Sequence, residues 1–164
     1  MPLPTGGNSN CVLIGMPGVG KSTIGVLLAK TLALQFLDTD VLIQAMECQR
    51  LQALLAEHGR DRFCALEERY VLSLNCQDHV IATGGSVVYS EAAMNHLHTH
   101  GVVVYLTLAL SSLSQRLNDL GARGVVMMPG QTLETLYIER EPLYRRHADL
   151  LVDCEGLHQE AIVD

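Results

Sequence analysis

The stretch GMPGVGKST, Gly15 to Thr23, lies between the apolar run CVLI and a segment whose apolar residues recur at helical spacing from Ile24 to Leu32. It matches the pattern G-x-x-x-x-G-K-[S/T] between a predicted strand and a predicted helix. In such a loop, glycines allow backbone N–H groups to surround phosphate oxygens, and the following helix N-terminus adds positive potential. The stretch therefore predicts a nucleotide-binding P-loop. Its expected nucleotide contacts are Gly15, Gly18, Val19, Gly20, Lys21, Ser22 and Thr23.

Two side chains of this loop have specific expected roles. Lys21 is expected to reach the β and γ phosphates, and the Ser22 hydroxyl is expected to ligate Mg²⁺. The sequence contains no Asn-Lys-x-Asp segment of the kind that guanine-specific switches carry. ATP is therefore the expected nucleotide.

Composition limits the class of protein. The 164 residues suit one domain, expected to span 11–164 after a flexible leader at 1–10. No apolar run reaches the roughly 20 residues of a membrane span. The formal net charge of −7 opposes non-specific nucleic-acid binding. The five cysteines are odd in number and scattered, which favours a reducing cytoplasm over a disulfide framework. A monomer is expected.

Predicted strands and helices alternate along the chain. Strands are expected at 11–15, 34–40, 79–85, 102–108 and 149–153, with helical patterns between them. This order predicts an α/β fold in which a central parallel sheet of about five strands has helices on both faces. Ligands of such sheets bind at the carboxyl ends of the strands.

The segment Asp38-Thr39-Asp40 ends the second predicted strand. The period of two in a strand would place both carboxylates on one side and Thr39 on the other. One carboxylate could support Mg²⁺, and the other could accept the proton of an attacking hydroxyl. The alternative is that Asp40 only caps the next helix.

Several stretches together, in this order, resemble shikimate kinase from about Cys11 to Asp153. They are GMPGVGKSTIG, LDTDVLI, FCALEE, ATGGSVV, VVVYL, ARGVV and EREPLYRRHAD. The resemblance implies a P-loop kinase that uses ATP and Mg²⁺. It further implies that Asp40 binds the acceptor hydroxyl and acts as the base, and that Asp38 supports Mg²⁺.

The resemblance also assigns roles to later residues. It implies that Gly84 and Gly85 present backbone groups to substrate and phosphate, and that Arg140 binds the substrate carboxylate. Arg116 would flank the adenine. Arg123 would reach the transferring phosphoryl group from a mobile lid at about 118–131.

Two residues depart from the family pattern at the acceptor site. Cys64 stands where the family has a second arginine for the substrate carboxylate, and Ser86 stands where it has a third glycine. Arg60, four residues before Cys64, is a candidate replacement if it shares that helix face, whereas Arg62 would point elsewhere. The alternative is that Arg60 is solvated and Cys64 is a small buried side chain.

Shikimate is the expected acceptor, with phosphoryl transfer giving shikimate 3-phosphate. A smaller hydroxy acid such as homoserine is the alternative, because it would tolerate a missing arginine and a narrower pocket. A third hypothesis, a nucleotide-binding module without catalysis, would be favoured by loss of Lys21, Ser22, Asp38 or Asp40, and all four are present.

The segment HLHTH places His96, His98 and His100 in alternation. Such tracts can bind metals. Because these three fall at the end of a predicted helix, surface histidines without a metal are expected.

Overall fold

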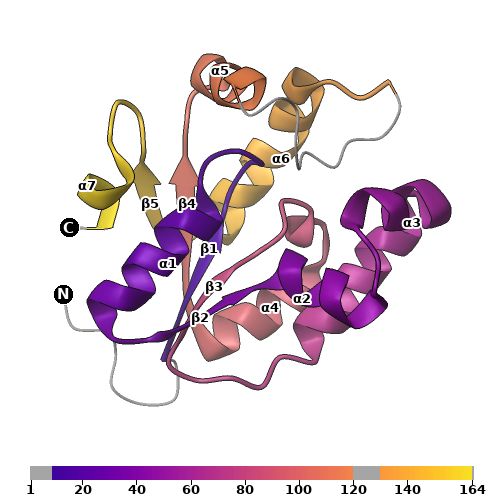
Figure 1. Cartoon of the computed structure of the whole chain (residues 1–164), viewed down its shortest axis with the longest axis horizontal. Helices are drawn as coiled ribbons and strands as arrows, with labels where there is room; N and C mark the ends of the chain where they lie inside the picture. The colour runs from indigo at the N-terminus through magenta and orange to yellow at the C-terminus, as the bar shows by residue number, and fades with distance from the viewer. Residues whose placement is uncertain (1–8, 120–129, 164) are drawn as a thin grey trace.

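The computed structural model describes residues 9–119 and 130–163, which contain a five-stranded sheet (Figure 1). Every strand pair is parallel, and the spatial order is β2-β3-β1-β4-β5. The strands are β1 (Asn10–Ile14), β2 (Gln35–Asp38), β3 (His79–Ala82), β4 (Gly101–Thr107) and β5 (Leu150–Asp153). The predicted α/β class, the five strands and their parallel arrangement are confirmed.

The helices alternate with the strands along the chain. They are α1 (Lys21–Leu32), α2 (Thr39–Glu47), α3 (Leu51–Leu72), α4 (Glu91–His100), α5 (Leu110–Asp119), α6 (Leu133–His147) and α7 (Gln159–Val163), with a short 3₁₀ turn, η1, at Val87–Tyr89. The β1-α1-β2 crossover runs toward one edge of the sheet and the later crossovers run toward the other. Right-handed connections therefore place α1 on the opposite face from α4 and α6.

The central strand β1 explains why the sheet needs helices on both faces. All five residues of β1 are buried, as expected for an apolar parallel strand with neighbours on either side. Its register aligns Cys11 with Val80 of β3 and Asn10 with Gly101 of β4. The three strands therefore end close together, and the loops that follow them meet at one edge of the sheet.

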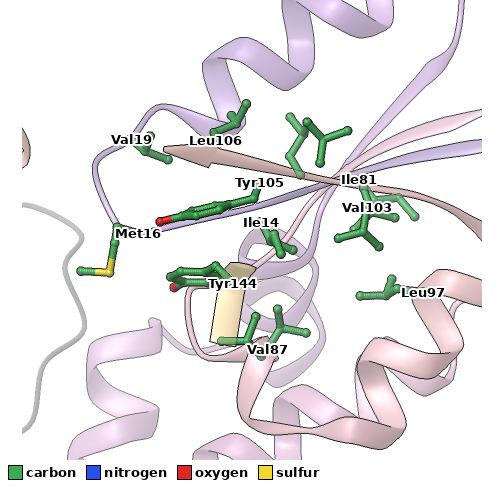
Figure 2. Close-up of a cluster of buried hydrophobic side chains, with 14 of the residues drawn as sticks. Ile14, Met16, Val19, Ile81, Val87, Leu97, Val103, Tyr105, Leu106 and Tyr144 are labelled. Carbon is green, nitrogen blue, oxygen red and sulfur yellow. The ribbon is translucent and has the colours of Figure 1, made fainter. Parts of the chain in front are cut away.

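The main core lies between the sheet and its helices, and Figure 2 shows part of it. Tyr105 of β4 stacks on Tyr144 of α6, with ring centroids 5.1 Å apart (Figure 2). Both tyrosines are almost completely buried. Because Met16 and Val19 of the P-loop belong to the same cluster, this packing also anchors the loop.

Helix α3 has a break at Gly59, whose φ of 74° and ψ of 172° are not helical. Glycine adopts a positive φ at little cost, so the chain can change direction here and begin a new helical turn at Arg60. The segments on either side of Gly59 pack with α2 in a small apolar cluster. This cluster includes Leu54 and Phe63 of α3 and Ile43 of α2. Gly59 thus ends one helical segment and precedes the next.

The ends of the expected domain differ in detail from the sequence ranges. Strand β1 begins at Asn10, one residue before the expected start of the domain, and Asp78 N donates to Ser9 Oγ at 2.9 Å. The rest of the expected leader, and most of the expected lid at about 118–131, lie outside the described residues.

Within the part of the chain that the structure describes, none of the helices is both long and apolar enough to cross a membrane.

Candidate active site

The P-loop joins the buried end of β1 to α1. Gly20 occupies the N-cap of α1 with a φ of 106°, a conformation that side chains disfavour and glycine permits. Lys21 Nζ donates to the carbonyl oxygens of Gly15 at 2.7 Å and Met16 at 3.0 Å. Burial lowers the pKa of Lys21 to about 8, although nearby acids, led by Asp40, oppose the shift. The loop therefore holds a largely desolvated amine beside the helix N-terminus.

The acidic segment after β2 is arranged differently from the sequence expectation. The strand ends at Asp38, which is the N-cap of α2, and Asp40 lies in the first helical turn. Asp38 Oδ1 accepts from the backbone N–H groups of Asp40 at 2.9 Å and Val41 at 3.2 Å. The prediction that a strand period of two orients both acids was therefore wrong, because the helix begins between them. The alternative of Asp40 as the cap was also wrong, since Asp38 is the cap.

Asp38 also contacts the P-loop. Ser22 Oγ donates to Asp38 Oδ2 at 2.5 Å, so the hydroxyl and the carboxylate meet at the start of α1. Both are oxygen ligands of the kind that Mg²⁺ prefers. Their chemistry fits the expected metal, and phosphate oxygens would supply further ligands.

Gly84 brings two carboxylates to the turn after β3. A Cβ atom at this position would lie 2.2 Å from Glu67 Oε1 and 2.7 Å from Asp40 Oδ1. Thr39 holds the turn, since its Oγ1 accepts from Gly84 N at 3.0 Å. Glycine is required here because the carboxyl groups pack against the bare backbone.

The two carboxyl groups have raised pKa values. Burial, reinforced by the charge of Asp38 and opposed by Lys21, raises the pKa of Asp40 to about 6. Burial raises the pKa of Glu67 to about 7, although its hydrogen bond from Ser86 lowers it. Ser86 Oγ donates to Glu67 Oε2 at 2.5 Å, and Glu67 Oε1 is buried without a hydrogen-bond partner among the described residues.

Arg140 reaches the site from α6. Its side chain is buried, and its Nε donates to Tyr89 Oη at 3.1 Å. A Cβ atom at residue 85 would lie 2.8 Å from Arg140 Nη1, so Gly85 allows the guanidinium to lie against the turn. Tyr144 Oη donates to the Gly85 carbonyl at 2.6 Å and fixes the turn from the core side. No ion pair joins Arg140 to a carboxylate of the described residues.

These groups line one cavity of about 720 Å³, a size typical of small-molecule sites. Lys21 and Ser22 line it at the P-loop, Asp40 and Glu67 at the acidic turn, and Arg140 on α6. Arg116 also lines it, and its Nη1 donates to the carbonyl of Val19 at 3.1 Å.

The structure brings most of the residues expected at the site together in this cavity. The following predicted residues line it: Gly18, Gly20, Lys21, Ser22, Thr23, Asp40, Arg60, Cys64, Gly84, Gly85, Ser86, Arg116 and Arg140. Three other predicted residues do not line the cavity. The Val19 side chain is buried in the core, Gly15 lies against the Leu106 carbonyl, and Asp38 acts through Ser22. Arg123 lies outside the described residues.

Sequence reasoning gave no role to Glu67, Thr39, Tyr89 or Glu139. Glu67 follows Cys64 by three residues and so shares its helix face, a signal that was available. Tyr89 lies in the short 3₁₀ turn and Glu139 on α6, where no local pattern distinguishes them.

The three histidines of the HLHTH segment are partly buried on α4. His96 Nε2 lies 2.8 Å from the Leu74 carbonyl, and His98 Nδ1 lies 3.4 Å from Asp149 Oδ2. Within residues 9–119 and 130–163, no group of three or more His, Cys, Asp or Glu side chains is placed to hold a metal ion.

A P-loop that shares a small-molecule cavity with a buried carboxylate, at the carboxyl ends of a parallel sheet, indicates phosphoryl transfer to a small acceptor. The class defined by this fold and site is that of P-loop kinases with an alcohol group as acceptor. Within that class, the chain belongs to the shikimate kinase family, because the family profile described as shikimate kinase matches residues 17–164.

Individual proteins support the assignment. The chain is 35% identical over 161 residues to a shikimate kinase of Rhizobium meliloti, covering 96% of this chain and 83% of the relative. It is 37% identical over 155 residues to a shikimate kinase of Mycobacterium avium, covering 93% of this chain and 88% of that relative. A structure of shikimate kinase from Acinetobacter baumannii in complex with shikimate superposes with a TM-score of 0.84 and 27% identity, covering 95% of this chain and 89% of that one. The predicted family and reaction class are confirmed.

Proposed function

We propose that this chain transfers the γ-phosphoryl group of ATP to a hydroxyl of shikimate, giving shikimate 3-phosphate. The observation that carries the acceptor assignment is Arg140, a buried guanidinium facing the cavity without a carboxylate partner among the described residues. A buried charge is costly unless it is paired, so an anionic group of the ligand is expected there. Shikimate supplies a carboxylate together with ring hydroxyls.

Asp40 is the proposed base. It lines the cavity, and its pKa of about 6 leaves it mostly ionised at neutral pH while still basic enough to accept a proton. Gly84 keeps the space beside it clear of side-chain atoms. The acceptor hydroxyl would therefore lie between Asp40 and the phosphate end of the cavity.

Lys21 and the P-loop backbone are proposed to bind the phosphates of ATP. Ser22 and Asp38 would hold Mg²⁺, since they offer a hydroxyl and a carboxylate in mutual contact. The metal, when bound with ATP, neutralises charge on the phosphates during transfer. Arg116, which lines the nucleotide end, is the proposed adenine neighbour.

We also propose that the enzyme works as a monomer in the cytoplasm. Its five cysteines are free thiols in the structure, which suits a reducing compartment. Size-exclusion chromatography with light scattering tests the monomer, for which a mass near 17.9 kDa is expected.

The test of the acceptor is ADP release with Mg²⁺-ATP against shikimate, homoserine, threonine and gluconate, with mass analysis of the products. Turnover with shikimate and a singly phosphorylated product supports the proposal. Turnover with homoserine instead would mean that the acceptor has changed while the phosphoryl-transfer residues remain. ADP release that does not depend on any acceptor would refute the kinase proposal.

A further inference from the structure

The acceptor end of the cavity contains a second arginine in an unexpected position. Cys64 occupies the place at which the family pattern has an arginine, and its thiol is half-buried in the cavity wall. Arg60 lies one helical turn earlier and lines the same cavity. The non-helical backbone at Gly59 starts this turn immediately before Arg60, so the two side chains share one face of α3.

Arg60 and Arg140 meet at Tyr89. The Arg60 Cζ atom lies 4.6 Å from the centroid of the Tyr89 ring, and the Arg140 Cζ atom lies 5.3 Å from it. Arg140 also donates from Nε to Tyr89 Oη at 3.1 Å. Tyr89 thus gathers two guanidinium groups from different helices beside one another, through attraction between each cation and the ring.

Two neighbouring cations repel each other unless something compensates their charge. Glu139 does so for Arg60, accepting a hydrogen bond from its Nη2. A guanidinium has five N–H donors, and only one of those on Arg60 is used in this bond. Among the described residues the other donors have no hydrogen-bond partner, so they are available to a ligand, and Arg60 remains 39% exposed at the cavity wall.

We propose that Arg60 binds the carboxylate of the acceptor together with Arg140, replacing the arginine that is missing at Cys64. Tyr89 and Glu139 are positioning residues for the Arg60 guanidinium. This inference rests on the proposed function only in requiring an acceptor with a carboxylate. It makes Arg60 a determinant of acceptor affinity that the phosphoryl-transfer step does not need.

Arg62 provides a matched control. It has the same charge, lies two residues further along the same helix, and is exposed outside the cavity. The test compares Arg60→Ala and Arg62→Ala by steady-state kinetics, with shikimate varied at saturating ATP and ATP varied at saturating shikimate. Arg60→Ala should raise the KM for shikimate about tenfold. This is the low end of the effect expected from losing a hydrogen bond to a charged group, because the Arg60 side chain is partly solvated. The kcat and the KM for ATP should change by less than about twofold in both variants.

A second substrate separates carboxylate binding from a structural effect. The methyl ester of shikimate lacks the negative charge, so Arg60→Ala should leave its KM within about twofold of wild type. A loss that is equal for the acid and the ester would show that Arg60 only supports the fold of α3, and would overturn the inference. Adding Cys64→Arg to Arg60→Ala should restore most of the affinity for the acid.

The outcomes also distinguish the inference from the proposed function. If shikimate is phosphorylated and Arg60→Ala behaves like Arg62→Ala, only the inference fails. If another hydroxy acid is the acceptor and its KM rises in Arg60→Ala, the shikimate assignment fails and the carboxylate role of Arg60 stands. An acceptor without a carboxylate would overturn both.

Discussion

Glu67 is a carboxyl group whose burial should make the stability of the enzyme depend on pH. The side chain is 2% exposed, and its Oε1 has no hydrogen-bond partner among the described residues. Its pKa is raised from 4.5 to about 7, chiefly by burial. Between these two pH values, the folded protein keeps a proton that the unfolded chain has released. The free energy of unfolding should therefore fall as the pH rises through this window, and Glu67→Gln should abolish that contribution.

The magnitude follows from the size of the shift. Each pKa unit corresponds to about 1.36 kcal/mol, so a shift from 4.5 to about 7 corresponds to about 3 kcal/mol. Glu67→Gln should have nearly the stability of wild type at pH 4.5, where Glu67 is protonated in the folded state and about half protonated in the unfolded chain. It should be more stable than wild type by about 3 kcal/mol at pH 8, or by about 6–12 °C in melting temperature for a chain of this length.

The assay is urea denaturation of both proteins at pH 4.5 and pH 8, followed by circular dichroism. Glu57→Gln is the control, because Glu57 is exposed on the same helix, α3. The control should show the same pH dependence as wild type. If the difference between Glu67→Gln and wild type is the same at both pH values, burial does not raise the pKa of Glu67, and the reasoning fails.

Three further predictions concern residues at the cavity and at the expected metal site. Asp40→Asn should keep ATP affinity within about twofold and lose at least about 100-fold in kcat. The kcat/KM of the wild-type enzyme should rise with pH up to about 6, as Asp40 ionises. Retained turnover of Asp40→Asn in a stopped assay would show that Asp40 is not the base. Gly84→Ala should destabilise the fold by about 1–3 kcal/mol, since its Cβ would meet Glu67 Oε1 at 2.2 Å; an unchanged thermal melting curve would contradict this. Asp38→Asn should still cap α2 but raise the Mg²⁺ concentration for half-maximal activity at least about tenfold. A Mg²⁺ titration of activity that matches wild type would show that Asp38 does not support the metal.

Local sequence signals were sufficient for the parts of the fold that depend on local chemistry. The P-loop and α1 could be predicted because glycine spacing, Lys21 and the apolar periodicity lie within a few residues of one another. The boundary between β2 and α2 could not be predicted, because the short acidic segment was compatible with both a strand and a helix. The Asp38 side chain decides the boundary by capping two backbone N–H groups of α2.

The acceptor site was predictable only in part, because its contacts join distant segments. The resemblance indicated Arg140 and the glycine turn, and the structure places both at the cavity. It gave no indication of Tyr89 or Glu139. Their contacts with Arg140 and Arg60 span 51 and 79 residues, and no local pattern encodes a contact at such separations. The position of Arg60 also depends on the non-helical backbone at Gly59.

The sheet order has a consequence for biosynthesis. Among the described residues, the central strand β1 pairs with β3 and β4, and β2 pairs with β3 alone. At translation rates of about 5–20 residues per second, Val80, the register partner of Cys11, is synthesised roughly 3–14 s after it. During this interval the apolar segment NCVLI leaves the ribosome without a partner strand. The nascent chain therefore exposes its most buried strand for seconds, and chaperones that bind extended apolar segments have time to act before the nucleotide site can form.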